Sequence, residues 1–204
     1  MSSTNRSTIL HPTRIDLSAD IRVQVIDSLN QAVAVTTDLK SQTKQAHWNV
    51  KGMDFYQLHE LFDEIAGELE EFIDLLAERV TALGGVAMGT IRMAVAASIL
   101  PEYPVEILDG KDHIAALADR FAIYAKLLRD GIAQTDELGD ADTADLYTEI
   151  SRTVDMRLWF LEAHLQAGDM SAANSNGKPA TAKTAAKTVA KTATAKTTAK
   201  KSKK

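Results

Sequence analysis

The chain has 204 residues, of which 45% are hydrophobic, and it carries a formal net charge of −5. That length and apolar fraction predict one domain of about 150 residues with a substantial core, plus a further segment. The chain contains no cysteine, which excludes disulfides, thiolate metal sites and a cysteine nucleophile. No stretch approaches the ~20 apolar residues of a membrane span, and no apolar run follows the first six residues, so neither a membrane segment nor a secretory signal is predicted.

The charge is distributed unevenly along the chain. Nine of the 23 basic residues lie in residues 178–204, which contain no acidic residue. Residues 1–177 therefore hold 14 basic and 28 acidic residues, a net charge of −14. The two parts are expected to serve different functions.

The periodicity of apolar residues predicts helices and no strands. Residues 1–17 are polar and are expected to form an extended arm. A first helix is predicted from its N-cap Ser18 to about His47, and a second from about Phe55 to Leu83, where two glycines end it.

A long crossover follows the second helix. Residues 86–108 contain two prolines and are predicted to carry one short helix at 90–98. A third helix begins after Asp109 or Asp112, and a fourth runs from about Asp142 to Gln166. Two short links and one long link predict an all-α four-helix bundle with a crossover.

The predicted bundle, residues 18–170, is followed by a segment, residues 171–204, that we expect to be disordered. It consists largely of Ala, Thr and Lys, so almost no apolar burial offsets its ordering entropy. Its spaced lysines would neutralise phosphates and bind nucleic acid without sequence preference. A solubilising tail or a membrane-surface tether is the alternative. The candidate DNA-binding residues are Lys183, Lys187, Lys191, Lys196, Lys200, Lys201, Lys203 and Lys204.

The second helix carries four metal-ligand side chains on one face, namely His59, Asp63, Asp74 and Glu78. The members of each pair are four residues apart and the pairs are separated by about three turns, so all four share one stripe. The centres of the pairs are roughly 22 Å apart along a straight helix, too far for one ion. An antiparallel second copy, crossing near Gly67, would place the first pair of one chain against the second pair of the other.

Two other interpretations of this stripe are open. The four residues could be solvated charges on an amphipathic helix, as the neighbouring glutamates are expected to be. Alternatively, His59-Glu60-x-x-Asp63 lacks one histidine of the His-Glu-x-x-His helix of zinc hydrolases, and no third ligand follows at the usual spacing. The stripe borders the apolar face, which favours a site between subunits, and His47 could join it from the preceding helix.

Three motifs resemble the DNA-binding mini-ferritins of starved bacteria, the Dps family. They are Ala46-His47-Trp48-Asn49-Val50-Lys51-Gly52, Leu58-His59-Glu60-Leu61-Phe62-Asp63 and Asp74-x3-Glu78-Arg79. The resemblance covers roughly residues 15–166 and implies a hollow homo-dodecamer built from two-fold dimers. It implies ferroxidase sites at the dimer interfaces, to which one subunit contributes His47, His59 and Asp63, and the other Asp74 and Glu78.

The chemistry that the resemblance implies is oxidation of Fe(II) to Fe(III), preferably by hydrogen peroxide, with storage of the ferric mineral and protection of DNA. Imidazole and carboxylate ligands suit Fe(II), although they exclude other divalent metals only weakly. The resemblance also implies acidic pores, with candidates Glu137, Asp140, Asp142 and Asp145, that would concentrate Fe(II). Complementing a helix dipole is the alternative for Asp142.

Other functions and residues are left open by the sequence. A DNA-compacting nucleoid protein with little iron activity is the main alternative, and a bundle for protein contacts is a third. Trp48 would quench a stray oxidant or simply pack. His11, His113 and His164 are interpreted as surface or satisfied core histidines, with His11 a possible accessory ligand. The expected location is the cytoplasm, with nucleoid association if the tail binds DNA.

Overall fold

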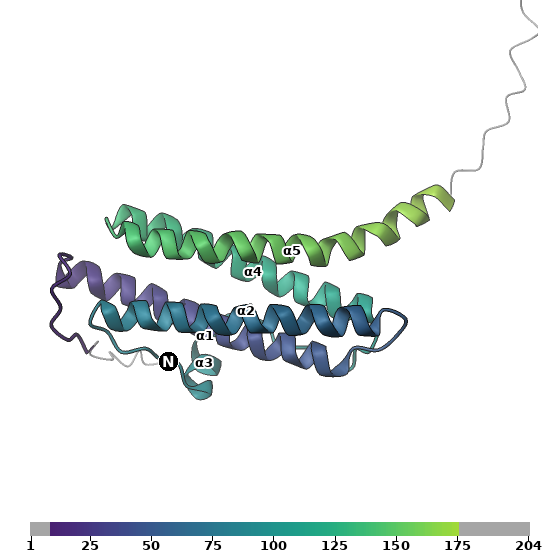
Figure 1. The fold of residues 1–204 in the computed structure, drawn as a ribbon, viewed down its shortest axis with the longest axis horizontal. Coiled ribbons are helices and arrows are strands. Elements are labelled where there is room, and N and C mark those ends of the chain that lie inside the picture. Colours follow the sequence, from purple (N-terminus) through teal and green to yellow (C-terminus); the bar gives the residue numbers. More distant parts are fainter. Residues whose placement is uncertain (1–8, 176–204) are drawn as a thin grey trace, which may run out of the picture. The chain divides into compact units, whose positions relative to one another are not determined.

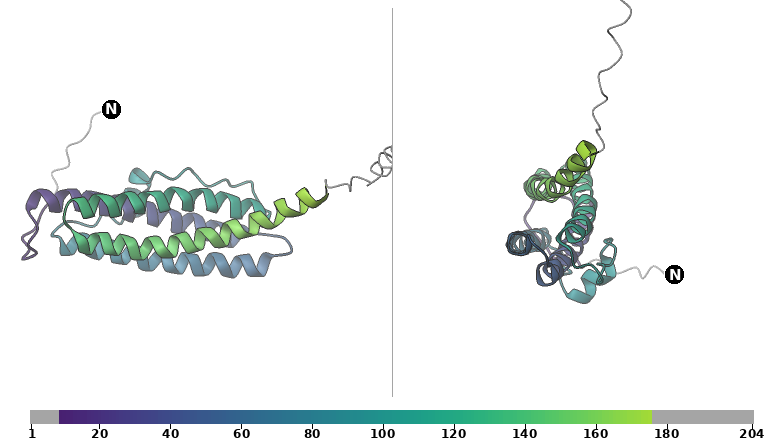
Figure 2. Two further views of the ribbon diagram at one scale, coloured as in Figure 1. Left: turned by 90° about the horizontal axis from the view of Figure 1, so that it is seen from above. Right: turned by 90° about the vertical axis from the view of Figure 1, so that its right-hand side faces the viewer.

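The computed structural model describes residues 9–175, and their side chains as far as residue 166. The predicted all-α four-helix bundle with a crossover is confirmed. Its long helices are α1 (Ala19–Asn49), α2 (Phe55–Ala82), α4 (Gly110–Glu137) and α5 (Ala141–Ser175), and α3 (Ile91–Ala97) is the short helix of the crossover. Helix α1 lies beside α2, and α4 beside α5 (Figures 1 and 2).

Helices α1, α3 and α4 begin at side-chain caps, whereas the N-cap of α2, Asp54, makes no side-chain cap hydrogen bond. The Ser18 hydroxyl accepts from the N–H of Ile21 at 3.3 Å, and Thr90 caps α3 in the same way. Asp109 accepts from the N–H of Lys111 at 2.9 Å, so Asp109, and not Asp112, caps α4. Each cap satisfies an N–H that has no partner within its own helix.

The end of α2 is joined to the N-terminal arm at Gly84. This glycine has φ of 86°, and a Cβ on it would lie 2.4 Å from the backbone oxygen of His11. The N–H of His11 donates to the Gly84 carbonyl at 2.7 Å. A side chain at position 84 would therefore strain the backbone and separate the arm from the bundle.

The predicted apolar stripes meet in one core, where burial of each large aliphatic or aromatic side chain contributes about 1.5–3 kcal/mol. Ile21, Ile132, Leu158 and Leu165 lie at its edge and are only partly buried. Its buried members include Val25, Leu29, Leu39, Leu58, Phe62, Ile65, Leu69, Leu76, Val80, Ile114, Leu117, Phe121, Leu128, Ile150, Val154 and Leu161.

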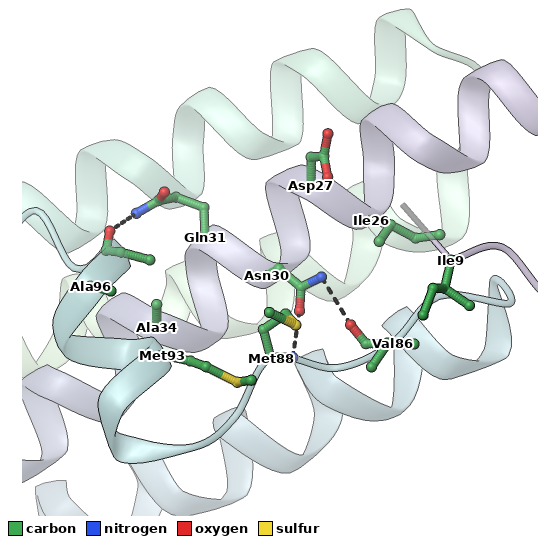
Figure 3. A pocket seen from close by; sticks show the side chains of 11 residues that line it. Ile9, Ile26, Asp27, Asn30, Gln31, Ala34, Val86, Met88, Met93 and Ala96 are labelled. Carbon is green, nitrogen blue, oxygen red and sulfur yellow. Dashed lines mark hydrogen bonds between the residues drawn. The ribbon is translucent and has the colours of Figure 1, made fainter. Parts of the chain in front are cut away.

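The crossover is held along α1 by amide side chains. Asn30 donates to the Val86 carbonyl at 3.2 Å and accepts from the N–H of Met88 at 2.8 Å. One residue on, Gln31 donates to the Ala97 carbonyl at 2.7 Å. Val86 and Met88 lie outside any helix, and the Ala97 carbonyl is at the last residue of α3, so these bonds satisfy backbone groups without a partner inside a helix. They hold the segment before α3, and the end of α3, against α1 (Figure 3).

Helix α5 is longer than the sequence predicts. It continues past Gln166 to Ser175, so residues 171–175 are helical, whereas the disordered segment was expected to begin at 171. Met170 and the two alanines that follow have high helix propensity, which favours continuation. The candidate DNA-binding lysines lie outside the described residues. No helix in the described part is long and apolar enough to span a membrane.

Candidate metal centre

His47 and His59 are joined across the α1–α2 turn. The Nδ1 of His47 donates to the His59 carbonyl at 2.8 Å, and the Nδ1 of His59 donates to the His47 carbonyl at 2.9 Å. Their rings stack with centroids 3.7 Å apart at 20°. Because a carbonyl only accepts, each Nδ1 carries a proton, and Nε2 is the ring nitrogen left for a metal.

Asp63 lies one turn after His59 and is half-exposed. Its carboxylate accepts from the ammonium of Lys44 on α1 at 2.5 Å. This hydrogen bond holds the pKa of Asp63 below its usual value, against a smaller opposing effect of burial, and the Lys44 charge also lowers it. The carboxylate is therefore ionised and ready for a cation, with Lys44 as its present partner.

Asp74 and Glu78 lie on the last turns of α2 and are exposed. Within the described part of the chain, no three His, Asp or Glu side chains come close enough to hold a metal ion. The structure therefore brings together the two histidines, whereas the acidic pair lies further along the same helix. One chain holds two incomplete halves, which we call the histidine half-site (His47, His59, Asp63) and the acidic half-site (Asp74, Glu78).

The surface beside the histidine half-site is apolar and open. Trp48 is 63% exposed, with the Lys44 ammonium 5.8 Å from its ring centroid, and the Phe55 ring lies tilted against His59 with centroids 5.2 Å apart. Packing of Trp48 within its own chain, the simpler expectation, is therefore not observed. Exposed aromatic side chains around a half-site are typical of a surface that another protein covers.

The four candidate pore residues differ in their surroundings. Asp140 is 3% exposed, because its carboxylate caps α5 through Thr143 at 3.1 Å and pairs with Arg79 at 2.6 Å. Glu137, Asp142 and Asp145 are exposed, and Asp142 lies 4.0 Å from Arg79. Asp140 thus holds the α4–α5 turn, while Glu137 and Asp145 present exposed carboxylates and Asp142 forms a long ion pair with Arg79.

A cavity of about 730 Å³ lies elsewhere, between α1, α3 and the start of the crossover (Figure 3). Its lining includes Ile9, Asn30, Met88 and Met93, and none of the candidate metal ligands. The mixture of apolar and amide side chains lacks the convergent charges of a metal site. The cavity therefore belongs to the packing of the crossover.

Several functional partners were missed by sequence analysis. Lys44 at Asp63 and Arg79 at Asp140 lie on other elements, 19 and 61 residues away. His113, expected to be a surface or satisfied core histidine, is buried with Nδ1 paired to Tyr103, but Nε2 has no partner among the described residues. No sequence spacing marks these pairs, because bundle topology brings them together.

Comparison with known proteins agrees with the observed bundle. The family model of the ferritin-like domain matches residues 26–171. A DNA protection during starvation protein of Agrobacterium fabrum is 43% identical over 156 residues, which are 76% of this chain and 96% of that protein. The fold and the matching family model define a ferritin-like protein.

Two solved structures of Dps proteins resemble this chain. DpsC from Streptomyces coelicolor superposes with a TM-score of 0.73 at 35% identity, covering 76% of this chain and 91% of that one. The Dps protein of Vibrio cholerae is described as a member of a broad superfamily of ferritin-like diiron-carboxylate proteins. It superposes with a TM-score of 0.71 at 28% identity, covering 76% of this chain and 98% of that one. The chain belongs to the Dps family of ferritin-like proteins.

Proposed function

We propose that the protein oxidises Fe(II) at sites shared by two chains, and stores the ferric product inside a hollow homo-dodecamer. Membership of the Dps family supports iron storage and DNA protection in general. The observation that carries the specific proposal is the division of ligands into a histidine half-site and an acidic half-site on one straight helix. Neither is a complete site alone, and a two-fold partner would join one of each.

The ligand chemistry supports iron as the substrate. The combined site would offer the Nε2 atoms of His47 and His59 and three carboxylates, a hard set that suits Fe(II). The Nδ1 bonds to backbone carbonyls orient both rings, as outer partners of metal-bound histidines do. Hydrogen peroxide is the proposed oxidant, because its reduction by two electrons from two Fe(II) ions releases no hydroxyl radical.

Complementation between two inactive chains tests the shared site. One chain carries His47→Ala and His59→Ala, and the other Asp74→Ala and Glu78→Ala. Assembled alone, each variant has no complete site and should oxidise Fe(II) only at the background rate. Assembled together, mixed dimers regain one complete site, so about a quarter of the sites should be active.

The control mixes the His47→Ala/His59→Ala chain with a chain that carries all four changes, which supplies no intact histidine half-site and restores nothing. Sites built within one chain predict no recovery in either mixture, and that result would refute the proposal. Size and metal content are measured on every assembly, so that failure to assemble is distinguished from failure to oxidise.

The acidic pore is a further part of the proposal. Glu137, Asp142 and Asp145 are exposed near the α4–α5 turn, and a ring of such carboxylates at a three-fold axis would raise the local concentration of Fe(II). Asp140 would support the turn. Replacing the three exposed residues by Asn or Gln should slow iron uptake at low Fe(II) concentration, and added salt should reduce the difference.

DNA binding is proposed for the lysine-rich segment alone. Residues 1–177 carry a net charge of −14 and would repel DNA, whereas residues 178–204 carry nine lysines and no acid. Twelve copies would add their affinities through multivalency. Truncation after Asn176 should abolish the gel shift at low salt and leave iron oxidation unchanged. Equal retention by the truncated chain would exclude this segment, and the expected location is the cytoplasm near the nucleoid.

A further inference from the structure

Tyr103 and His113 form a buried pair that the proposed metal centre does not use. The phenol oxygen of Tyr103 lies 2.7 Å from Nδ1 of His113, and the two residues are 8% and 1% exposed. The Nε2 of His113 has no hydrogen-bond partner among the described residues. A buried imidazole with one free nitrogen is uncommon, because an unpaired polar atom raises the free energy of the folded state.

Burial keeps both groups neutral. It raises the pKa of Tyr103 and lowers the pKa of His113, although Asp112 and Asp109 partly oppose the second effect. A neutral phenol beside a neutral imidazole allows the O–H to donate to Nδ1. The pair is thus arranged so that the phenol proton has an acceptor at hydrogen-bond distance.

Arg120 places a buried positive charge over the Tyr103 ring. Its guanidinium carbon lies 5.2 Å from the Tyr103 ring centroid, and the residue is 5% exposed. Its N–H groups go to backbone carbonyls and to Gln42, and it forms no salt bridge with any described residue. A fixed positive charge over the ring disfavours a protonated tyrosine radical cation, so the ring can lose an electron only if it also loses its proton.

Packing joins the surroundings of this pair to the two helices that carry the histidine half-site. Gly110, at the start of the helix that carries His113, packs so tightly on Leu58 of α2 that a Cβ there would lie 2.4 Å from that side chain. Arg120, over the Tyr103 ring, bonds to Gln42 of α1. The pair is therefore packed against the same two helices, α1 and α2, that carry His47 and His59.

We propose that Tyr103 is a redox-active residue that gives an electron to one-electron oxidants formed during iron oxidation, with His113 as the acceptor of its proton. This inference rests on the proposed iron chemistry. When one Fe(II) reduces hydrogen peroxide by a single electron, it yields Fe(III), hydroxide and a hydroxyl radical. The radical takes one electron from Tyr103 and becomes hydroxide, while the phenol proton moves to Nδ1 of His113.

The products of this step are a neutral tyrosyl radical and an imidazolium. Asp112 and Asp109, which raise the pKa of His113, stabilise the imidazolium. A second Fe(II) returns the electron and becomes Fe(III), and the proton returns to the phenol oxygen. The net result consumes a damaging radical with a second ion of the same substrate, which limits oxidation of the protein and of nearby DNA.

Freeze-quenched electron paramagnetic resonance after mixing Fe(II)-loaded protein with hydrogen peroxide tests this proposal. The wild type should give a tyrosyl signal that narrows in protein labelled with ring-deuterated tyrosine. Tyr103→Phe should remove the signal while keeping the ring over Arg120, and His113→Gln should reduce its yield severalfold. The matched controls are Tyr124→Phe and Tyr147→Phe, whose buried hydroxyls bond to Thr36 and Ser28 instead of an imidazole.

The spectra of the wild type and of the variants support or overturn the role of Tyr103. A tyrosyl signal that survives in Tyr103→Phe, or iron oxidation in the wild type without any tyrosyl signal, overturns the inference but not the proposed function. If Tyr103→Phe fails to fold, Tyr103 can be replaced by difluorotyrosine, which keeps the phenol group. The fluorine couplings of this residue must then appear in the tyrosyl signal. If the wild type does not oxidise Fe(II), the proposed function fails, and the same variants treated with a photogenerated ruthenium oxidant decide the role of Tyr103.

Discussion

The rings of His47 and His59 stack 3.7 Å apart, and each Nδ1 donates to the backbone carbonyl of the other residue. This reciprocal arrangement joins the last turn of α1 to the first turn of α2. The same two hydrogen bonds have two consequences. They close the α1–α2 turn, and they place a proton on Nδ1 of both rings. Both Nε2 atoms are left for a metal.

Replacing His59 with Ala should therefore impair metal binding by more than the loss of one ligand. The substitution also frees the His47 carbonyl and leaves the His47 ring without its stacking partner. Disturbing such outer contacts alone usually lowers metal affinity by about 10- to 100-fold. We expect Fe(II) oxidation at or near background, measured by absorbance of the ferric product, with helix content preserved in circular dichroism.

His164→Ala is the matched control for this experiment. His164 is an exposed histidine of α5 that bonds only to the Phe160 carbonyl of its own helix, at 2.7 Å. Its loss should leave the oxidation rate unchanged. A His59→Ala protein that keeps the wild-type rate would remove the histidine half-site from the proposed mechanism.

Lys44 should act as a competitor for the cation at Asp63. Its ammonium holds the carboxylate at 2.5 Å, and a bound metal must displace it. The pair is partly exposed, so its strength is limited to about 0.2–1 kcal/mol and Lys44→Met should tighten metal binding by up to about fivefold. Calorimetric titration with a redox-inert divalent cation measures this, and Lys40→Met, which removes a similar pair with Glu70, should change nothing.

The same pair predicts a specific pH dependence. Lys44 lowers the pKa of Asp63 in the folded state, so the pair stabilises the fold above the ordinary pKa of 3.8, and this contribution is lost as pH falls through the lowered value. In Lys44→Met the pKa of Asp63 should move up towards 3.8. Carbon-detected nuclear magnetic resonance of the Asp63 carboxyl group measures this pKa. An unchanged pKa in Lys44→Met would show that Lys44 does not cause the lowering.

Much of this fold follows from local signals. The caps at Ser18 and Asp109 and the glycine at position 84 mark helix ends by their own chemistry, and the stripe of ligands on α2 follows from spacing alone. These features need no knowledge of distant residues. That is why the boundaries of α1 and α2 could be predicted, whereas the assignment of the candidate ligands to two half-sites stays a prediction.

Other features depend on which helices become neighbours. Lys44 reaches Asp63 only because α1 packs on α2, and Tyr103 reaches His113 only because the crossover returns over the start of α4. Likewise, Asp140 can pair with Arg79 only because the end of α2 packs beside the α4–α5 turn. Charge and spacing identify these residues as polar, but the pairing comes from tertiary packing.

Gly67 has no function within its own chain and should mark the contact between two copies. It is exposed in the middle of α2, and a Cβ there would meet nothing within 4 Å. Glycine in a helix interior destabilises it by about 0.5–1 kcal/mol relative to alanine, so Gly67→Ala should raise the stability of the folded chain. Gly67→Leu should also fold, but it should prevent the close approach of two α2 helices.

The comparison of these two variants separates folding from assembly. Analytical ultracentrifugation should find assembled Gly67→Ala and smaller species for Gly67→Leu, with iron oxidation lost in the second. Full-sized, active Gly67→Leu would mean that the helices do not cross at this residue. It would also weaken the proposal that the two half-sites meet across α2.

Arg79 and Asp140 form the buried ion pair of the α4–α5 turn, with side chains 16% and 2% exposed. Removing Arg79 leaves a buried carboxylate without its charge partner, which typically lowers stability by about 3–5 kcal/mol. Arg79→Ala should therefore lower the free energy of unfolding strongly. Arg129→Ala removes an ion pair with Asp155 in which both side chains are 52% exposed, and should change stability by less than about 1 kcal/mol.

A double variant distinguishes loss of the pair from loss of packing. Arg79→Met/Asp140→Asn removes both charges, while the amide oxygen of Asn can still accept from the N–H of Thr143, which Asp140 now caps at 3.1 Å. Most of the stability lost in Arg79→Ala should return, because no unpaired charge remains buried. Urea denaturation of each variant measures these differences. A double variant as unstable as Arg79→Ala would show that the arginine acts through its packing, and not through the charge of Asp140.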